Sequence, residues 1–179
     1  MKKALLVVDI QNEYFKGGNL ELFKPEEALK NANALIDYAR NEGYEIYVIQ
    51  HFSLNEDIPI FLPNSNGSKL HKDLDVQSEV VITKNYPNSF RDTNLQAQLI
   101  KNDIEELIIC GSMSHVCIDS TVRAAFDLGY KVTLAHDACA TRDLEFNGLV
   151  IEADKVHGSY MSALAWGFCD VKSTNEIIN

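Results

Sequence analysis

Cys117 is the residue in this sequence with the clearest potential for covalent chemistry. It ends the segment 111–117 (Gly-Ser-Met-Ser-His-Val-Cys), which lies between an apolar run, residues 107–110, and an amphipathic run, residues 118–128. That order predicts a strand, a tight turn and a helix, with the thiol in the first turn of the helix. Unpaired N–H groups and the positive dipole end of a helix favour the thiolate, which is the nucleophilic form of cysteine. A buried cysteine that serves only as a small apolar side chain is the alternative.

Asp9 and Lys84 also directly follow apolar, strand-like runs. An acid, a lysine and a cysteine on one rim would form a nucleophilic set. Asp9 would take the thiol proton and later give it to a leaving amine, and Lys84 would lower the pKa of the thiol. The backbone N–H groups of Met113 and Cys117 would stabilise the oxyanion. Taken singly, Asp9 is also suited to a turn or a helix cap, and Lys84 to a solvated strand end.

The sequence predicts that a parallel sheet positions these residues. Strand-like runs, several of them continuously apolar, alternate with helical patterns. The expected strands are residues 4–8, 45–50, 80–83, 107–110, 131–135 and 169–172, and the expected helices are residues 25–41, 93–102, 117–128 and 147–166. This alternation indicates an α/β protein with helices on both faces of the sheet. Ligands bind such sheets at the carboxyl ends of the strands, so we expect Asp9, Lys84 and Cys117 at one edge.

Residues 1–179 are expected to form one domain, because the chain contains no linker, internal repeat or low-complexity tract. Residues 53–75 interrupt the alternation of expected strands and helices, because this stretch is polar and contains two of the four prolines. Long loops in compact domains are usually functional. We therefore expect this loop to decide the substrate.

The composition excludes several classes of partner. The chain carries 16 basic and 26 acidic residues, a net charge of −10 at pH 7, and neither nucleic acid nor an anionic membrane attracts a polyanion. No apolar run approaches the ~20 residues of a membrane span, and the first apolar run leads into Asp9 without a signal-peptide cleavage site. The four cysteines form no CxxC pair. We therefore expect a cytoplasmic protein with free thiols.

Five segments of the sequence resemble a known family, the isochorismatase-like cysteine hydrolases. They are residues 5–15, which contain Asp9, residues 82–84, which end in Lys84, residues 111–121, which contain Cys117, and residues 124–130 and 137–141 downstream. The resemblance extends over essentially the whole chain, and the order Asp, Lys, Cys at strand ends is quite specific. It implies a three-layer α/β/α, Rossmann-like fold with a six-stranded parallel sheet in the order 3-2-1-4-5-6.

The resemblance also implies the chemistry. The family hydrolyses an amide or carbamoyl C–N bond through a covalent thioester, and a non-proline cis peptide bond precedes the nucleophile, here between Ser112 and Met113. The Cys117 thiolate would attack the carbonyl, and Asp9 would protonate the departing ammonia or amine. Asp9 would then activate the water that hydrolyses the thioester. Relatives often form dimers or tetramers, so we expect a homo-oligomer.

The family leaves the substrate open. It includes nicotinamidases, carbamoyl and ureido hydrolases, antibiotic-lactam hydrolases, and isochorismatases proper, which cleave a vinyl ether and lack the cysteine. Cys117 therefore favours a small-molecule amide as the substrate, with vinyl ether hydrolysis as the alternative. Nicotinamidases carry a metal site after the second strand, but His51 stands here in place of their aspartate and Ser53 in place of their first histidine. The spacing of His51, Asp57 and His71 is poor for a metal site, so we expect neither a metal nor another cofactor.

Other side chains near the three strand ends are candidates for contact with the substrate. They are Gln11, Tyr14 and Phe15 after Asp9, His51 after the second strand, Tyr86 and Phe90 after Lys84, and His115 before Cys117. His115 is expected at the pocket rim or at an interface, because side chains at i and i+2 of a tight turn diverge. Packing in the core is the alternative for the aromatic residues.

Two other classes of function stay open. A non-catalytic binding protein on this fold would be expected to lose one of Asp9, Lys84 and Cys117, and all three are present. A redox-sensing thiol protein would need a resolving cysteine close to Cys117, whereas Cys110 is expected to be buried in the preceding strand. Both are therefore less favoured than a cysteine hydrolase.

Overall fold

A parallel sheet of six strands forms the middle layer of the protein. The computed structural model describes residues 1–55 and 57–179. The strands of this sheet are β1 (Lys2–Val8), β2 (Glu45–His51), β3 (Val80–Lys84), β4 (Ile104–Ser112), β5 (Lys131–Ala140) and β8 (Asp170–Lys172). The helices are α1 (Pro25–Asn41), α2 (Leu95–Lys101), α3 (Asp119–Asp127), α4 (Ala153–Ala165) and α5 (Thr174–Ile178). In the described part of the chain, every helix is too short or too polar to cross a membrane.

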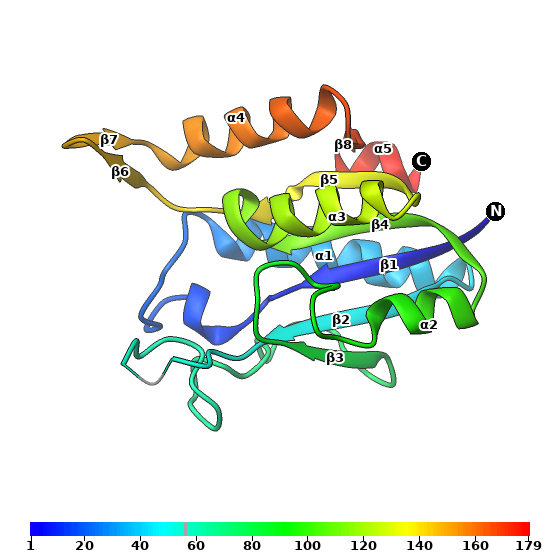
Figure 1. Cartoon of the computed structure of the whole chain (residues 1–179), viewed down its shortest axis with the longest axis horizontal. Helices are drawn as coiled ribbons and strands as arrows, with labels where there is room; N and C mark the ends of the chain where they lie inside the picture. Colours follow the sequence, from blue (N-terminus) through cyan, green and yellow to red (C-terminus); the bar gives the residue numbers. More distant parts are fainter. Residues whose placement is uncertain (56) are drawn as a thin grey trace.

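The strand order is β3-β2-β1-β4-β5-β8, and all neighbouring strands are parallel (Figure 1). Residues of β1 alternate between two cores: Leu5 and Val7 pack with residues of α1, and Leu6 and Val8 pack with residues of α2, α3 and α4. Because both faces of the central strands are covered, these strands are continuously apolar in sequence. The fold class and strand order that the sequence predicts are therefore confirmed.

The last long helix is shorter than the sequence pattern predicts. We expected a helix over residues 147–166, but α4 begins at Ala153 and is preceded by an antiparallel hairpin of β6 (Leu144–Phe146) and β7 (Leu149–Ile151). The turn residues Asn147 and Gly148 have φ values of 51° and 75°. Asn-Gly is a preferred sequence for two-residue hairpin turns with positive φ at both positions, so the prediction was wrong because it overlooked this turn signal.

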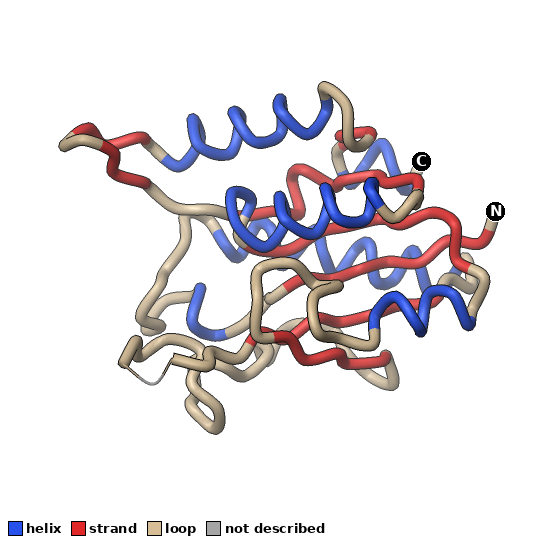
Figure 2. The backbone as a smooth tube through the Cα atoms, viewed as in Figure 1, coloured by secondary structure: helices blue, strands red, loops and turns tan. Residues whose placement is uncertain are grey.

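The long loop between β2 and β3, residues 52–79, is held against the segment that follows β1 (Figure 2). Glu13 in that segment is 1% exposed, and its carboxylate accepts the N–H groups of Asn19 (2.7 Å) and Phe61 (2.9 Å). Gly67 lies so close to it that a Cβ atom there would be 2.0 Å from Glu13 Oε2. Hydrogen bonds to an ionised acceptor are strong, so this buried carboxylate fixes the loop near the carboxyl end of β1.

A cluster of ion pairs joins α1 to the end of the same loop. Arg40 Nε donates to Glu79 Oε1 at 2.7 Å, and Arg40 Nη1 pairs with Asp75. Hydrogen bonds from Arg40 lower the pKa of Asp75, and the pKa of Glu79 is also lowered, since its hydrogen bonds outweigh burial. A carboxyl whose pKa is lower in the folded chain stabilises the fold above its unfolded-state pKa. That contribution is lost as the pH falls through the folded-state pKa.

We therefore expect Arg40→Gln to lower the midpoint of thermal unfolding at pH 7 by about 2–4 °C. The difference from the wild type should shrink as the pH falls from about 5 towards 2, because both carboxyls then become protonated in either protein. Thermal unfolding of both proteins, measured across this pH range, checks whether the difference between their midpoints shrinks as the pH falls. Lys2→Gln, which removes an exposed pair with Asp103, is the control and should change little. A difference in midpoint that stays constant with pH would contradict the lowered pKa values of Asp75 and Glu79.

Candidate active site

The carboxyl ends of β1, β3 and β4 bring Asp9, Lys84 and Cys117 together. Asp9 directly follows β1, Lys84 ends β3, and Cys117 lies in η2 (Ser114–Ile118), a π-helical turn between β4 and α3. Lys84 Nζ lies 2.7 Å from Asp9 Oδ2 and 3.3 Å from Cys117 Sγ. Asp9 is 0%, Lys84 1% and Cys117 5% exposed. The three side chains therefore form one buried cluster of an acid, a cation and a thiol.

The ammonium group of Lys84 is the centre of this cluster. Besides its two contacts above, Nζ donates to Tyr86 O at 3.1 Å and lies 3.3 Å from His51 Nδ1. Burial lowers the pKa of Lys84, but the charges of Asp9 and Cys117 outweigh burial and raise the pKa above its ordinary value. Lys84 is therefore a cation at neutral pH. Within the described residues, Asp9 Oδ1 has no hydrogen-bond partner.

The electrostatic environment of Cys117 differs from the one that the sequence predicts. We expected the helix N-terminus and Lys84 to lower the pKa of the thiol. Burial, followed by the charge of Asp9, instead raises the pKa of Cys117 well above its ordinary value, and Lys84 offsets only part of this rise. The thiol therefore keeps its proton in the resting site.

His51 extends the cluster from the end of β2. Burial and then the charge of Lys84 lower the pKa of His51 to about 4, so its imidazole is neutral at pH 7. Beside an ammonium group, Nδ1 is the acceptor nitrogen and Nε2 carries the proton. The ring also packs edge to face on Phe61, with 5.3 Å between the ring centroids. His51 therefore contributes a neutral hydrogen-bonding wall to the site.

The turn after β4 depends on Gly111. Its φ is +124°, it pairs with Val8 of β1, and a Cβ atom on Gly111 would lie 1.9 Å from Val8 O. Only glycine fits at this position. The peptide bond between Ser112 and Met113 is cis, as the family resemblance implies. The close approach of β4 to β1 brings the turn that carries Cys117 next to Asp9.

We expect Gly111→Ala to destabilise the protein by about 3 kcal/mol or more, because the methyl group would force β1 and β4 apart in a strained backbone. Gly129→Ala is the matched control: φ at Gly129 is +90°, but no atom lies within 4 Å of the position that its Cβ would take. Gly129→Ala should lower the free energy of unfolding only by the backbone strain, about 1 kcal/mol. Urea denaturation measures both losses. Equal losses would contradict the close contact with Val8.

The candidates that follow Asp9 are all buried. Gln11 Nε2 donates to His51 O (2.8 Å) and Ser68 O (2.7 Å), and Gln11 Oε1 accepts from His51 N (2.8 Å). Its amide is therefore used in joining the end of β2 to the long loop. Burial, followed by the charges of Cys117 and Asp9, raises the pKa of Tyr14. Phe15 is 6% exposed. Their contact with a substrate stays a prediction.

The candidates that follow Lys84 and precede Cys117 lie in less buried positions. Tyr86 is half-buried and contributes its carbonyl oxygen to the Lys84 ammonium. Phe90 stacks on Tyr130 with 6.1 Å between the ring centroids. His115 Nδ1 lies 2.6 Å from Thr141 Oγ1. Burial and then the charge of Arg142 lower the pKa of His115, so its ring is neutral at pH 7.

Comparison with known proteins identifies the family. The family model described as the isochorismatase domain matches residues 3–164. This chain belongs to the isochorismatase family. An uncharacterized isochorismatase family protein of Bacillus subtilis (strain 168), YddQ, is 40% identical over 179 residues, with 99% of each chain covered. The nicotinamidase of Escherichia coli (strain K12) is 26% identical over 175 residues, with 76% of this chain and 82% of that protein covered.

A solved structure supports the same identification. The crystal structure of a protein from Oleispira antarctica, assigned to the isochorismatase hydrolases, is 42% identical to this chain, with a TM-score of 0.93. The match covers 99% of this chain and 96% of that one. The chain is therefore a hydrolase of the isochorismatase family.

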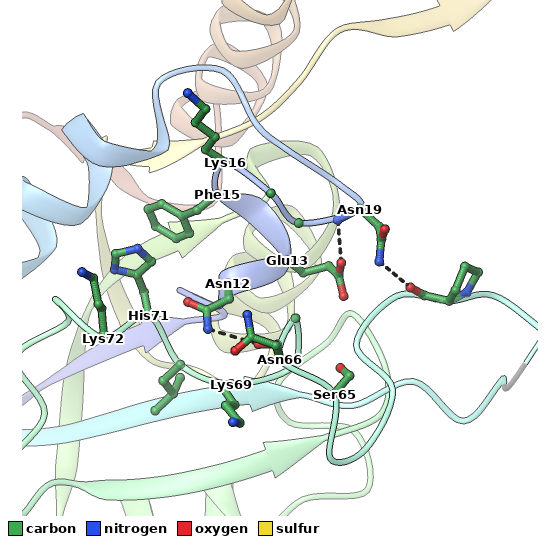
Figure 3. Close-up of a pocket in the computed structure, with 15 residues that line it drawn as sticks. Asn12, Glu13, Phe15, Lys16, Asn19, Ser65, Asn66, Lys69, His71 and Lys72 are labelled. Carbon is green, nitrogen blue, oxygen red and sulfur yellow. Dashed lines mark hydrogen bonds between the residues drawn. The ribbon is translucent and has the colours of Figure 1, made fainter.

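The isochorismatase-family hydrolase also has a cavity of about 770 Å³ between residues 12–19 and the long loop (Figure 3). Lysine and asparagine side chains surround it, and the rings of Phe15 and His71 lie side by side at its wall, with 4.0 Å between their centroids. None of the three residues of the buried cluster lines this cavity. It is therefore separate from the cluster of Asp9, Lys84 and Cys117.

The structure does not assemble a metal site from His51, Asp57 and His71. Across residues 1–55 and 57–179, no group of three or more His, Cys, Asp or Glu side chains could hold a metal ion. His51 instead faces Lys84, and His71 stacks on Phe15.

Three features of the site of this isochorismatase-family hydrolase could not be predicted from its sequence. Ser114 Oγ, next to the expected oxyanion turn, lies 2.8 Å from His157 Nδ1 of α4. The charge of Arg142 acts on both His115 and Tyr14. Phe61 packs edge to face on the rings of His51 and Tyr14. These contacts join residues far apart in the chain, and no local pattern of sequence indicates them.

Proposed function

We propose that this protein is a cysteine hydrolase that cleaves the C–N bond of a small-molecule amide or carbamoyl compound through a thioester on Cys117. The observation that carries the proposal is the buried contact of Lys84 Nζ with Cys117 Sγ at 3.3 Å and with Asp9 Oδ2 at 2.7 Å. Hydrolysis of a vinyl ether makes no use of such a thiol. Nicotinamidase, a relative of this chain, is named for an amide substrate.

The reaction begins with transfer of the Cys117 proton to Asp9, since the raised pKa of the thiol keeps it protonated until then. Sγ attacks the carbonyl carbon, and the N–H groups of Met113 and Cys117 stabilise the oxyanion. Asp9 gives its proton to the leaving nitrogen, and ammonia or an amine departs. Asp9 next takes a proton from water, whose oxygen attacks the thioester and releases the acid product. The proton on Asp9 then returns to the departing thiolate.

The other residues of the site stabilise the reacting groups and line the proposed substrate pocket. Lys84 stays protonated throughout and stabilises the charges of Asp9 and of the transient thiolate. The proposed pocket walls are Gln11, Tyr14, Phe15, His51, Tyr86, Phe90 and His115. We also propose that residues 1–179 act as one domain, as a homo-oligomer, in the cytoplasm and without a cofactor.

Release of ammonia from a panel of nicotinamide, small carbamoyl and ureido compounds and isochorismate tests the proposed bond type. Ammonia is expected from at least one amide, carbamoyl or ureido compound, and isochorismate should be stable. Cleavage of isochorismate at the same rate by the wild type and by Cys117→Ala, with no ammonia from the other compounds, would overturn the proposal and favour a vinyl ether hydrolase.

A further inference from the structure

Ser114 and His157 form a contact that the proposed reaction does not use. Ser114 is the first residue of the η2 turn and is 0% exposed. Its Oγ lies 2.8 Å from Nδ1 of His157, a half-buried residue of α4, and 3.3 Å from Ala140 O at the end of β5. Serine side chains in a helical turn often bond the backbone of the same turn. This hydroxyl instead joins the turn that carries Cys117 to two other elements of the fold.

The proton positions in this contact follow from what each group can donate. A carbonyl oxygen only accepts, so the single hydroxyl proton of Ser114 is used in the hydrogen bond to Ala140 O. Nδ1 of His157 then donates to Ser114 Oγ. Burial, followed by the charge of His136, lowers the pKa of His157, so its ring is neutral at pH 7 and has one proton to donate. A chain of two hydrogen bonds therefore runs from α4 through the turn to β5.

The helix α4 is a fixed support for this chain of hydrogen bonds. Met161 is 7% and Leu164 0% exposed, and both pack in the core with residues of α2 and α3. Asp143, just beyond β5, accepts the N–H group of Ala153, the first residue of α4, with Oδ1 at 2.8 Å. The position of His157 is therefore set by the core and by the end of β5, and not by the turn that it contacts.

The η2 turn carries the groups that the proposed reaction needs. Ser114 lies between Cys117 and Met113, whose N–H group is one of the two proposed oxyanion donors. Met113 O accepts the N–H groups of Val116 and Ile118, each at 3.1 Å, so the turn is one hydrogen-bonded unit. A shift at Ser114 would therefore move both oxyanion donors. Such donors act only when they point at the place where charge develops, and a misplacement of about 1 Å can lower a rate about 10²-fold.

We propose that Ser114 and His157 are positioning residues, which hold the oxyanion donors of the η2 turn in place from α4. The proposal rests on the proposed hydrolysis at Cys117, and it gives a role to a helix that contributes no reacting group to that mechanism. The oxyanion forms only in the transition state. Loss of the pair is therefore expected to lower kcat and to leave KM nearly unchanged.

Steady-state kinetics with the panel compound that the wild type hydrolyses fastest tests this role. Ser114→Ala and His157→Leu should each lower kcat about 10- to 100-fold and change KM less than about twofold. His157→Asn should recover most of the wild-type kcat, because its amide N–H group takes the position of Nδ1 and donates to Ser114 Oγ. Ser159→Ala is the matched control on α4. The Ser159 hydroxyl donates to Lys155 O within the helix, and its loss should leave kcat unchanged.

The double variant Ser114→Ala with His157→Leu distinguishes one hydrogen-bonded unit from two independent effects. Its kcat should fall no further than that of the slower single variant, because either change breaks the same chain. Thermal unfolding shows which variants are folded, and Ser114→Ala, which removes one oxygen atom, carries the test if His157→Leu does not fold. Losses that multiply, folded single variants with unchanged kcat, or a His157→Asn variant as slow as His157→Leu would overturn the proposal.

Hydrogen–deuterium exchange of residues 113–118 tests the anchoring of the turn without a substrate. Exchange in this segment should be at least about tenfold faster in Ser114→Ala and His157→Leu than in the wild type and His157→Asn, because the turn loses its hydrogen bond to α4. Equal exchange in all four proteins would overturn the anchoring. A wild type that shows the expected exchange but releases no ammonia would contradict the proposed hydrolysis and still support the anchoring, so the two failures are distinguishable.

Discussion

Replacing Cys117 with alanine is expected to lower ammonia release by at least about three orders of magnitude, because the thiol that contacts Lys84 and would form the thioester is removed. The fold should survive, since the change removes a single buried sulfur atom and leaves the Asp9–Lys84 ion pair in place. Steady-state ammonia release and thermal unfolding of the same preparation measure the two effects.

Cys169→Ala is the matched control for this substitution. Cys169 is a free, half-buried thiol that lies beside β8, outside the cluster, and its loss should leave the rate unchanged. Cys117→Ser, which keeps the volume but offers a weak nucleophile, should be nearly as inactive as the alanine variant. An alanine variant that retains more than a small fraction of the wild-type rate would rule out Cys117 as the nucleophile.

Replacing Asp9 with asparagine is expected to impair both catalysis and stability. Asp9 has a φ of 53°, a conformation that asparagine adopts readily, so the backbone should be kept. The rate should fall by about 10²- to 10⁴-fold, because the site loses the group that accepts the thiol proton. The fold should lose about 3–5 kcal/mol, because the Lys84 ammonium is left buried without its counter-ion.

A double variant separates the two effects. In Asp9→Asn combined with Lys84→Met, no uncompensated cation is buried, so much of the lost stability should return while the rate stays low. Urea denaturation of the two single variants and the double variant gives the coupling energy. Additive losses of stability would contradict the buried ion pair.

The pH dependence of thiol alkylation tests whether the charge of Asp9 raises the pKa of Cys117. The negative charge of Asp9 raises the pKa of Cys117, so its removal in Asp9→Asn should lower that pKa. Iodoacetamide should then modify Cys117 at lower pH in the variant than in the wild type. Cys169, whose pKa burial raises to about 12, is the internal reference and should not change. An unchanged pH profile for Cys117 would contradict the influence of Asp9.

The sequence predicts the sheet and the assembly of the cluster, because both depend on patterns that are local to each strand. Asp9 and Lys84 follow apolar runs, and a parallel sheet necessarily brings such strand ends to one edge. Residues 147–151, the second half of the hairpin, were wrongly assigned to the last helix because their apolar residues are as frequent as those of a buried helix. Only the Asn147-Gly148 pair distinguishes it.

The electrostatics of the site could not be predicted, because they depend on distances between residues that are remote in sequence. The thiol of Cys117 was expected to ionise easily, but its burial and the charge of Asp9 act in the opposite direction. Gln11 was expected to face the substrate, whereas the folded loop occupies its amide with His51 and Ser68. Neither contact has a local signal in the chain.

Trapping with hydroxylamine tests the central claim, a thioester on Cys117, most directly. With any substrate that releases ammonia, added hydroxylamine should convert part of the product from the free acid into the hydroxamate. The ammonia released should still match the total of the two products, and Cys117→Ala should form neither product at a measurable rate. Ammonia release by the wild type that yields only the free acid, at every concentration of hydroxylamine, would contradict the account and indicate direct attack by water.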